Sequence, residues 1–209
     1  MQGNSRKINN RGGGKIIGNF ASQKTGKMIR WESQLERDYI YHLELDPNVI
    51  DYVSQPEAIE YKNIDGKIAK YTPDFWVKRQ NCEELVEIKP KEKTMETDFM
   101  EKIKSIDIAI KSAGYKYLII TEEDIYINPK FTNLKLLYRY SRFSPNEFKK
   151  EICVSYFRKK ESAILRDILN DLSKQNITID IIFQLLGRGI LSIDLNKKLD
   201  LDTCIYMTS

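Results

Sequence analysis

Two acidic residues and a lysine occupy neighbouring strand-like segments of this chain. Asp74 closes the run Tyr71-Thr72-Pro73-Asp74, and Glu87 and Lys89 come soon after it. Magnesium prefers oxygen ligands and usually takes one or two carboxylates from a protein, so Asp74 and Glu87 would suffice to hold it. The ammonium of Lys89 can orient a water molecule or stabilise charge that develops on a phosphate. These residue types indicate metal-assisted cleavage of a phosphodiester.

The elements expected around these residues support the grouping. In residues 84–89 a period of two places Glu87 and Lys89 on the same face of a strand. Asp74 lies in a segment rich in aromatic and β-branched residues, and Pro73 interrupts that segment, so a bend there would aim Asp74 inward. A surface hairpin with outward charges fits the same pattern and remains an alternative.

A third acid lies in a predicted helix over residues 32–46. Glu36 falls within the apolar row of this helix, which is formed by Leu35, Tyr39, Ile40 and Leu43. A carboxylate that faces the core is costly unless it is paired or binds a cation, which favours Glu36 as a metal ligand. Glu32, near the positive end of the helix dipole, is the alternative without a catalytic role.

Together these segments resemble the PD-(D/E)xK nucleases, and more narrowly the N-terminal domain of TnsA. TnsA is the endonuclease subunit of heteromeric, TnsABC-type cut-and-paste transposases. The resemblance covers about residues 33–121 and rests on Leu35-Glu36-Arg37-Asp38, Asp46-Pro47-Asn48-Val49, Gln55-Pro56, Tyr71-Thr72-Pro73-Asp74-Phe75 and Val86-Glu87-Ile88-Lys89-Pro90. It implies a restriction-endonuclease-like α/β core.

The resemblance also implies roles for single residues. Glu36, Asp74, Glu87 and Lys89 would be catalytic, and the first three would bind Mg²⁺ together with the backbone carbonyl of Ile88, with Mn²⁺ as a substitute. The best-known member of the family has glutamine where this chain has Glu87. Gln55 either supports this site or fixes the turn before Pro56 through its side-chain amide.

By the same resemblance, the chain would cut double-stranded DNA at transposon ends. It would nick the non-transferred strand at the 5′ ends, while a DDE-type, TnsB-like transposase cuts and joins the 3′ ends and an AAA+ regulator similar to TnsC takes part. A stand-alone restriction or repair nuclease with the same core is one alternative. A catalytically silent DNA-binding or assembly subunit is another.

Composition permits DNA binding without requiring it. The 209 residues include 41% hydrophobic residues, enough for a core, and carry a net charge of +4. Residues 1–30 are basic, contain no Asp or Glu and include three consecutive glycines, so we expect a flexible arm. Arg6, Lys7, Arg11 and Lys15 would contact DNA phosphates there, or the arm would only aid solubility.

A nuclease domain is expected over residues 31–128. After the first helix we predict strands at 49–54, 57–64 and 67–77, with a two-residue hairpin turn at Asp65-Gly66, and a further strand at 84–89. A helix over 95–112 and a buried strand over 115–121 complete a crossover connection.

The remaining residues, 129–209, are mainly helical in pattern and resemble a winged-helix module. We predict helices at 133–140, 145–158, 162–172 and 178–186, then a two-stranded wing at 190–195 and 203–207. Arg188, Lys197 and Lys198 would touch DNA phosphates or a protein partner, or would simply be a helix-end cation and a polar turn. The helix over 178–186 is too apolar to read base edges.

Cysteine usage and hydropathy place the protein in a reducing, aqueous compartment. Cys82, Cys153 and Cys204 are odd in number and widely spaced, which disfavours a disulfide framework or a zinc site. No run has the length of a signal core or a membrane span. We therefore expect a soluble protein of the bacterial cytoplasm, without a membrane partner. His42, the single histidine, is expected to be packed or hydrogen-bonded rather than a ligand.

Overall fold

The computed structural model describes residues 16–208, and the chain divides into two compact units that meet between Ile125 and Tyr126. This division lies close to the predicted boundary at 128/129. Of the basic residues assigned to the N-terminal arm, Arg6, Lys7, Arg11 and Lys15 lie outside the described residues.

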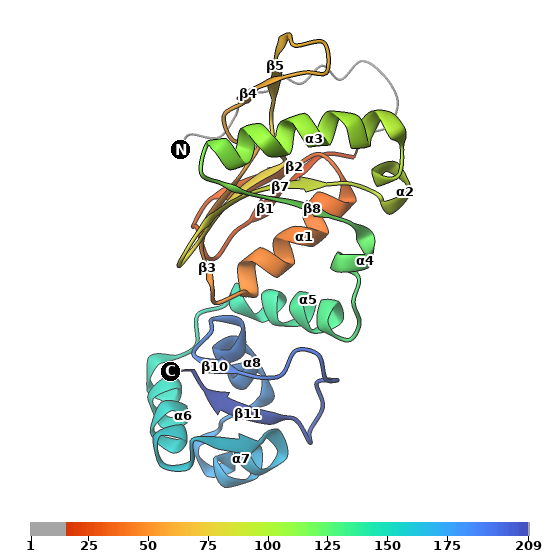
Figure 1. Ribbon diagram of the computed structural model, residues 1–209. Helices are drawn as coiled ribbons and strands as arrows, with labels where there is room; N and C mark the ends of the chain where they lie inside the picture. Colours follow the sequence, from red (N-terminus) through yellow and green to blue (C-terminus); the bar gives the residue numbers. More distant parts are fainter. Residues whose placement is uncertain (1–15, 209) are drawn as a thin grey trace. The chain divides into compact units, whose positions relative to one another are not determined.

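A four-stranded sheet forms the centre of the first unit (Figure 1). Its strands stand in the order β3 (Val49–Ser54), β6 (Phe75–Arg79), β7 (Glu83–Ile88) and β8 (Lys116–Ile120). The first three are antiparallel, whereas β7 and β8 are parallel. The parallel pair requires a long connection, which α2 (Lys91–Thr94) and α3 (Thr97–Ser112) supply. This is the crossover predicted from the sequence, with the short helix α2 added.

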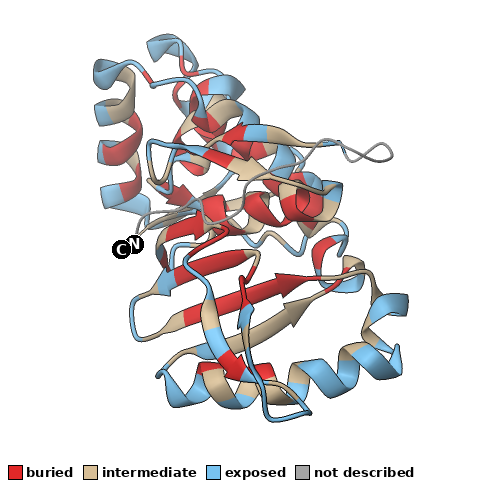
Figure 2. Cartoon of the chain, turned by 90° about the horizontal axis from the view of Figure 1, so that it is seen from above, coloured by how far each residue is buried: buried red, intermediate tan, exposed pale blue. Residues whose placement is uncertain are grey.

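Helices cover both faces of this sheet (Figure 1). On one face, α1 (Gln34–Leu45) buries Ile40 and Leu43, and the ring of Tyr39 lies 5.6 Å from that of Phe75. On the other face, α3 packs against Trp76 and Leu85 through the residues Ile106 and Ile110. Figure 2 shows that burial is concentrated in the central strands β6 and β7, whereas the outer side of α3 is exposed. The strand β8 is half-buried and not buried as predicted, because it lies at the edge of the sheet. The period of two along each strand therefore sends alternate side chains into two separate cores.

A separate hairpin, β4 (Ile59–Lys62) and β5 (Ile68–Tyr71), precedes β6. Its turn contains Gly66 at a φ of 75°, a conformation that glycine adopts without strain. The strand predicted over 67–77, with an interruption at Pro73, is broken at residues 72–74, and its two parts, β5 and β6, belong to different sheets. Pro73 explains the break, because it donates no ladder hydrogen bond and restricts the residue before it. The break places Asp74 immediately before β6.

Residues 18–31 form a second hairpin, so the prediction of a flexible arm is wrong for this part of the chain. Its strands β1 (Gly18–Ala21) and β2 (Met28–Trp31) pair antiparallel, and Phe20 and Ile29, opposite each other, are both buried. The carboxylate of Glu44 accepts hydrogen bonds from the Ser22 hydroxyl at 2.5 Å and the Gln23 amide at 2.8 Å. The burial of Phe20 and Ile29 and the hydrogen bonds to Glu44 therefore hold this segment in an ordered hairpin, although its composition predicted disorder.

The second unit contains helices and one small sheet. After α4 (Glu122–Ile125), the last helix of the first unit, come α5 (Lys130–Ser141), α6 (Glu147–Lys160), β9 (Ser162–Ile164), α7 (Leu165–Asp171), a 3-10 turn at Ser173–Gln175, α8 (Ile179–Gly187), β10 (Leu191–Ser192) and β11 (Cys204–Met207). The strand order β10-β11-β9 makes an antiparallel sheet of three strands, so residues 162–164 are a strand and not the predicted start of a helix.

Helix α8 buries five apolar residues, Ile181, Ile182, Phe183, Leu185 and Leu186, and leaves Asp180 exposed and Gln184 half-buried one turn later. Its last residue, Gly187, lies so close to α5 that an added Cβ would stand 2.4 Å from the Leu137 carbonyl oxygen. The close approach of α5 accounts for the wide apolar face of α8.

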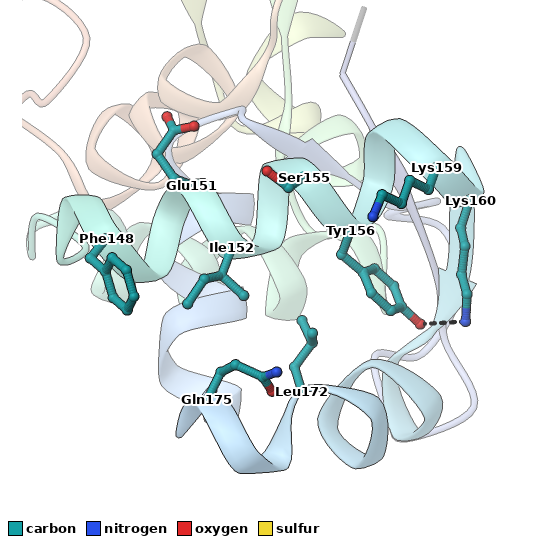
Figure 3. A pocket seen from close by; sticks show the side chains of 9 residues that line it. All are labelled: Phe148, Glu151, Ile152, Ser155, Tyr156, Lys159, Lys160, Leu172 and Gln175. Atoms are coloured by element: carbon teal, nitrogen blue, oxygen red, sulfur yellow. Dashed lines mark hydrogen bonds between the residues drawn. The ribbon is translucent and has the colours of Figure 1, made fainter.

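A shallow groove of about 430 Å³ lies on the outer side of α6 (Figure 3). Phe148, Ile152 and Tyr156 from α6 line it opposite Leu172, and Lys160 donates to the Tyr156 hydroxyl at 3.0 Å. None of the predicted catalytic residues lines this groove. Within residues 16–208, no helix is long and apolar enough to cross a membrane.

Candidate active site

Asp74 lies immediately before β6, beside the carboxyl end of the neighbouring strand β7. Its amide donates to the Val86 carbonyl at 3.0 Å, and its carboxylate oxygen Oδ2 accepts from the Ile88 amide at 2.7 Å. The antiparallel register of β6 and β7, in which Phe75 faces Val86, creates this arrangement. The carboxylate of Asp74 is therefore fixed beside the carboxyl end of β7.

Glu87 and Lys89 come from that same end of β7. Glu87 is 9% exposed, and its Oε1 lies 3.4 Å from the ammonium of Lys89. The amide of Lys89 donates to the Ile120 carbonyl at 3.0 Å, and its ammonium stands 5.6 Å from the ring centroid of Phe99 on α3. The Lys89 side chain thus reaches back to the carboxylate two residues earlier, as a period of two requires.

Glu36 stands in the first turn of α1 and is buried at 8% exposure. Its amide donates to the hydroxyl of Ser33, the N-cap residue, and its Oε2 accepts from the Glu32 amide at 2.7 Å. This carboxylate therefore also accepts a hydrogen bond from a backbone amide that lies just before its own helix. Glu32 contributes its backbone to this contact.

The electrostatics of Asp74 show that the three acids lie near one another. Burial raises the pKa of Asp74 well above its usual value, and the charges of Glu87 and Glu36 raise it further. The hydrogen bond from the Ile88 amide and the charge of Lys89 act in the opposite direction but do not compensate. The protein by itself thus holds more negative charge here than its own cation balances, which is the condition that a bound cation relieves.

The donor set fits a hard divalent cation. Among residues 16–208, no three His, Cys, Asp or Glu side chains enclose a ready-made metal cage. Magnesium does not need one, because it keeps several waters and uses one or two carboxylates, here Asp74 and Glu87. The carbonyl of Ile88 as a ligand stays a prediction.

Gln55 provides a further observation beside Asp74. Its amide donates to the Asp74 carbonyl at 2.8 Å, its φ is 48°, and its side chain is 3% exposed. In the described part of the chain, Oε1 of Gln55 is buried without a hydrogen-bond partner. A buried amide oxygen normally has a partner, so water or a ligand is expected there. The alternative, in which the side-chain amide of Gln55 fixes the turn before Pro56, stays a prediction.

Two tyrosines belong to this site although no sequence pattern assigned either of them a role. The Tyr71 hydroxyl donates to Oε2 of Glu87 at 2.5 Å, and it lies 2.9 Å from the Tyr117 hydroxyl. Tyr71 is part of the Tyr-Thr-Pro-Asp run, but its contact with Glu87 depends on how the β4–β5 hairpin packs on the sheet. The contact between Tyr71 and Glu87 is therefore visible only in the tertiary structure.

The predicted cationic residues of the second unit are spread over two local structures. Arg188 donates to the Phe143 carbonyl at 3.1 Å and to the Ser144 hydroxyl at 3.2 Å, so it ties the end of α8 to the connection between α5 and α6. Lys197 and Lys198 are exposed in the loop between β10 and β11. In the first unit, His42 is hydrogen-bonded through Nε2 to the Ile125 carbonyl at 2.9 Å, the packed role that we expected.

A comparison with protein families gives a match over residues 46–122 to the family described as TnsA-like endonuclease N terminal. The matched range contains Asp74, Glu87 and Lys89, begins after Glu36 and ends near the boundary of the first unit. No curated protein matches the chain. The mixed α/β sheet and the acids at its edge agree with this match, and the resemblance predicted from the sequence is confirmed: residues 46–122 match the TnsA-like endonuclease N-terminal family.

Proposed function

We propose that this protein is a metal-dependent DNA endonuclease subunit of a cut-and-paste transposase. It would cleave the non-transferred strand at the 5′ ends of the transposon, in concert with a DDE-type transposase. The observation that carries the proposal is the surplus of buried negative charge around Asp74 within a TnsA-like domain. A restriction-endonuclease-like core would present these acids to DNA from the edge of its sheet.

Each side chain has a distinct part in the proposed reaction. Asp74 and Glu87 would hold Mg²⁺, or Mn²⁺ in its place, and Gln55 would orient a water molecule through its unpartnered Oε1. When bound, the metal lowers the pKa of a coordinated water and shields the phosphate. Lys89, 3.4 Å from Glu87, would donate to the phosphate and offset charge that develops on it. Glu36 would add to the negative field that attracts the cation.

We further propose that the second unit is winged-helix-like and that it contacts DNA or a partner through the loop over residues 193–203. Lys197 and Lys198 are exposed in this loop, so their ammonium groups are accessible to DNA phosphates or to acidic groups of a partner. Against α8 as a reading helix is its burial, since α5 packs along it at Gly187. Arg188 would serve to fix the α5–α6 connection rather than to touch phosphates.

The experiment that tests the enzymatic proposal maps nicks on DNA that carries the transposon ends. The purified chain is incubated with Mg²⁺ or Mn²⁺, alone and together with a TnsB-like DDE-type transposase and a TnsC-like AAA+ regulator. We expect nicks at the 5′ ends that depend on metal and on the partner, and that disappear in Asp74→Asn and Lys89→Ala. Efficient double-strand cutting by the chain alone would support a stand-alone nuclease instead. No cleavage in any combination would support a silent assembly subunit.

The loop is tested by the salt dependence of DNA binding. The double variant Lys197→Gln with Lys198→Gln should lower the slope of log affinity against log salt by about 1 for each lost phosphate contact. Lys174→Gln, an exposed lysine elsewhere in the same unit, is the matched control. An unchanged slope for the loop variant would assign the loop to a protein partner or to no partner.

A further inference from the structure

The buried hydroxyl of Tyr71 contacts the carboxylate of Glu87, although the two residues lie on different sheets. Tyr71 ends β5 of the separate hairpin, whereas Glu87 belongs to the central sheet. The Tyr71 hydroxyl lies 2.5 Å from Oε2 of Glu87, and the exposed fractions of the two residues are 8% and 9%. A short bond of this kind, buried away from water, is among the stronger hydrogen bonds that a neutral donor can make to a carboxylate.

Tyr117 extends this contact into a chain of hydrogen bonds. Tyr117 lies on β8, opposite Leu85 of β7, and its hydroxyl is 2.9 Å from that of Tyr71. A phenol has one proton to give, and an ionised carboxylate can only accept. Tyr71 therefore donates to Glu87 and accepts from Tyr117. The two rings meet edge to face at 89° with their centroids 6.2 Å apart, which limits the rotation of both.

The two oxygens of Glu87 consequently have different neighbours. Oε2 is bound by Tyr71, and Oε1 lies on the side of Lys89 at 3.4 Å. Rotation of the carboxylate would break the bond from Tyr71 and leave a buried acceptor unsatisfied. Oε1 is therefore the oxygen of Glu87 that would bind a cation next to Lys89.

Tyr71 is itself held firmly. Its ring is part of a buried apolar cluster that also contains Val53, Tyr61, Trp76, Leu85, Ile106 and Ile110. The hydroxyl thus has a fixed position beside Oε2 of Glu87.

We propose that Tyr71, supported by Tyr117, is a positioning residue that orients Glu87 so that Oε1 faces Lys89 and the cation. This inference rests on the proposed metal-dependent function and deepens it. Neither tyrosine needs to touch DNA or the metal. Both act through Glu87, since hydrogen bonds to a ligating carboxylate tune its geometry and basicity.

The test measures Mn²⁺ binding to the full chain by titration calorimetry without DNA, so that it does not depend on cleavage. We expect Tyr71→Phe to weaken Mn²⁺ binding by about 10- to 100-fold and Tyr117→Phe to weaken it by less. Tyr61→Phe is the matched control, because Tyr61 is equally buried in the same cluster, and its binding should equal that of the wild type. Glu87→Gln reports whether Glu87 is a ligand at all.

A second readout separates positioning from loss of structure. In cleavage assays, Tyr71→Phe should lower kcat at limiting Mn²⁺, leave the KM for DNA unchanged and recover most of its rate at saturating Mn²⁺. If Tyr71→Phe does not fold, Tyr117→Phe is judged by the same two measurements.

The outcomes distinguish the two proposals. Unchanged Mn²⁺ binding in Tyr71→Phe and Tyr117→Phe, together with weak binding in Glu87→Gln, would overturn the positioning role alone. Absence of Mn²⁺ binding in the wild type, or normal binding in Glu87→Gln, would overturn the metal role of Glu87 and the positioning role with it.

Discussion

Replacement of Asp74 by asparagine should stabilise the metal-free protein while it removes the activity. Burial, Glu87 and Glu36 together raise the pKa of the Asp74 carboxyl well above 3.8, which means that its charge is unfavourable in the fold. Asparagine keeps an oxygen that can accept from the Ile88 amide but carries no charge. We therefore expect the charge of Asp74, which the proposed reaction needs, to lower the stability of the metal-free protein.

The size of the effect follows from the linkage between protonation and folding. Above pH 3.8 the unfolded chain releases the Asp74 proton, whereas the folded protein retains it. The wild type therefore loses stability as the pH rises from 3.8 to the raised pKa of the folded state. Each pKa unit corresponds to about 1.4 kcal/mol. We expect Asp74→Asn to raise the free energy of unfolding at neutral pH by at least about 1 kcal/mol.

The assay is urea unfolding of the full chain in the presence of a chelator, once near neutral pH and once near pH 3.8, where the effect of the Asp74 charge begins. The gain in Asp74→Asn should shrink in the more acidic series. Asp65→Asn, the same chemical change at an exposed position in the β4–β5 turn, should leave stability nearly unchanged. When Mn²⁺ replaces the chelator, the wild type should gain about 2.7 kcal/mol at a concentration of 100 times its Kd, and the variant should gain far less.

Two results would refute this reasoning. A metal-free Asp74→Asn protein that is less stable than the wild type at neutral pH would mean that the carboxylate makes a favourable contact in the fold. Equal stabilisation of both proteins by Mn²⁺ would mean that Asp74 is not a ligand.

Three further predictions concern other parts of the molecule. Gly187→Ala should destabilise the second unit by about 1–2 kcal/mol in urea unfolding, because the clash of its Cβ with the Leu137 carbonyl outweighs the gain in helix propensity; a stability gain would contradict the close approach of α5. In the native protein a thiol reagent should modify Cys204 faster than Cys153, which is buried with a pKa raised to about 11, and mass spectrometry that finds the reverse order would refute the packing of α6. Burial opposes ionisation of Asp46, but hydrogen bonds from the Arg79 guanidinium and the Asn48 amide lower its pKa overall. The ionised carboxylate therefore stabilises the fold above pH 3.8, and this stabilisation is lost as the pH falls through the lowered pKa. Asp46→Asn should therefore cost about 1 kcal/mol at neutral pH and little in acid, and an equal loss at both would exclude this ionic contribution.

Much of the site could be predicted from local sequence. The period of two placed Glu87 and Lys89 on one face of a strand, and the structure has Oε1 of Glu87 3.4 Å from the Lys89 ammonium. Helical spacing placed Glu36 in the inward row of α1, where it is 8% exposed. Asp65-Gly66 predicted the turn of the β4–β5 hairpin. These features depend on residues close in sequence, for which backbone geometry alone sets the direction of a side chain.

Other features depend on packing between distant segments, and only the tertiary structure decided them. Phe20 and Ile29 order a basic segment that reads as a flexible arm, because each gains a buried partner that its own neighbours do not supply. The register of β6 against β7 brings the Ile88 amide to Asp74 across the sheet. Tyr71 reaches Glu87 because its hairpin folds onto the sheet. The sequence by itself thus determined which groups could perform the chemistry, and the tertiary fold decided their partners and charge balance, since burial and long-range contacts arise only when the chain is packed.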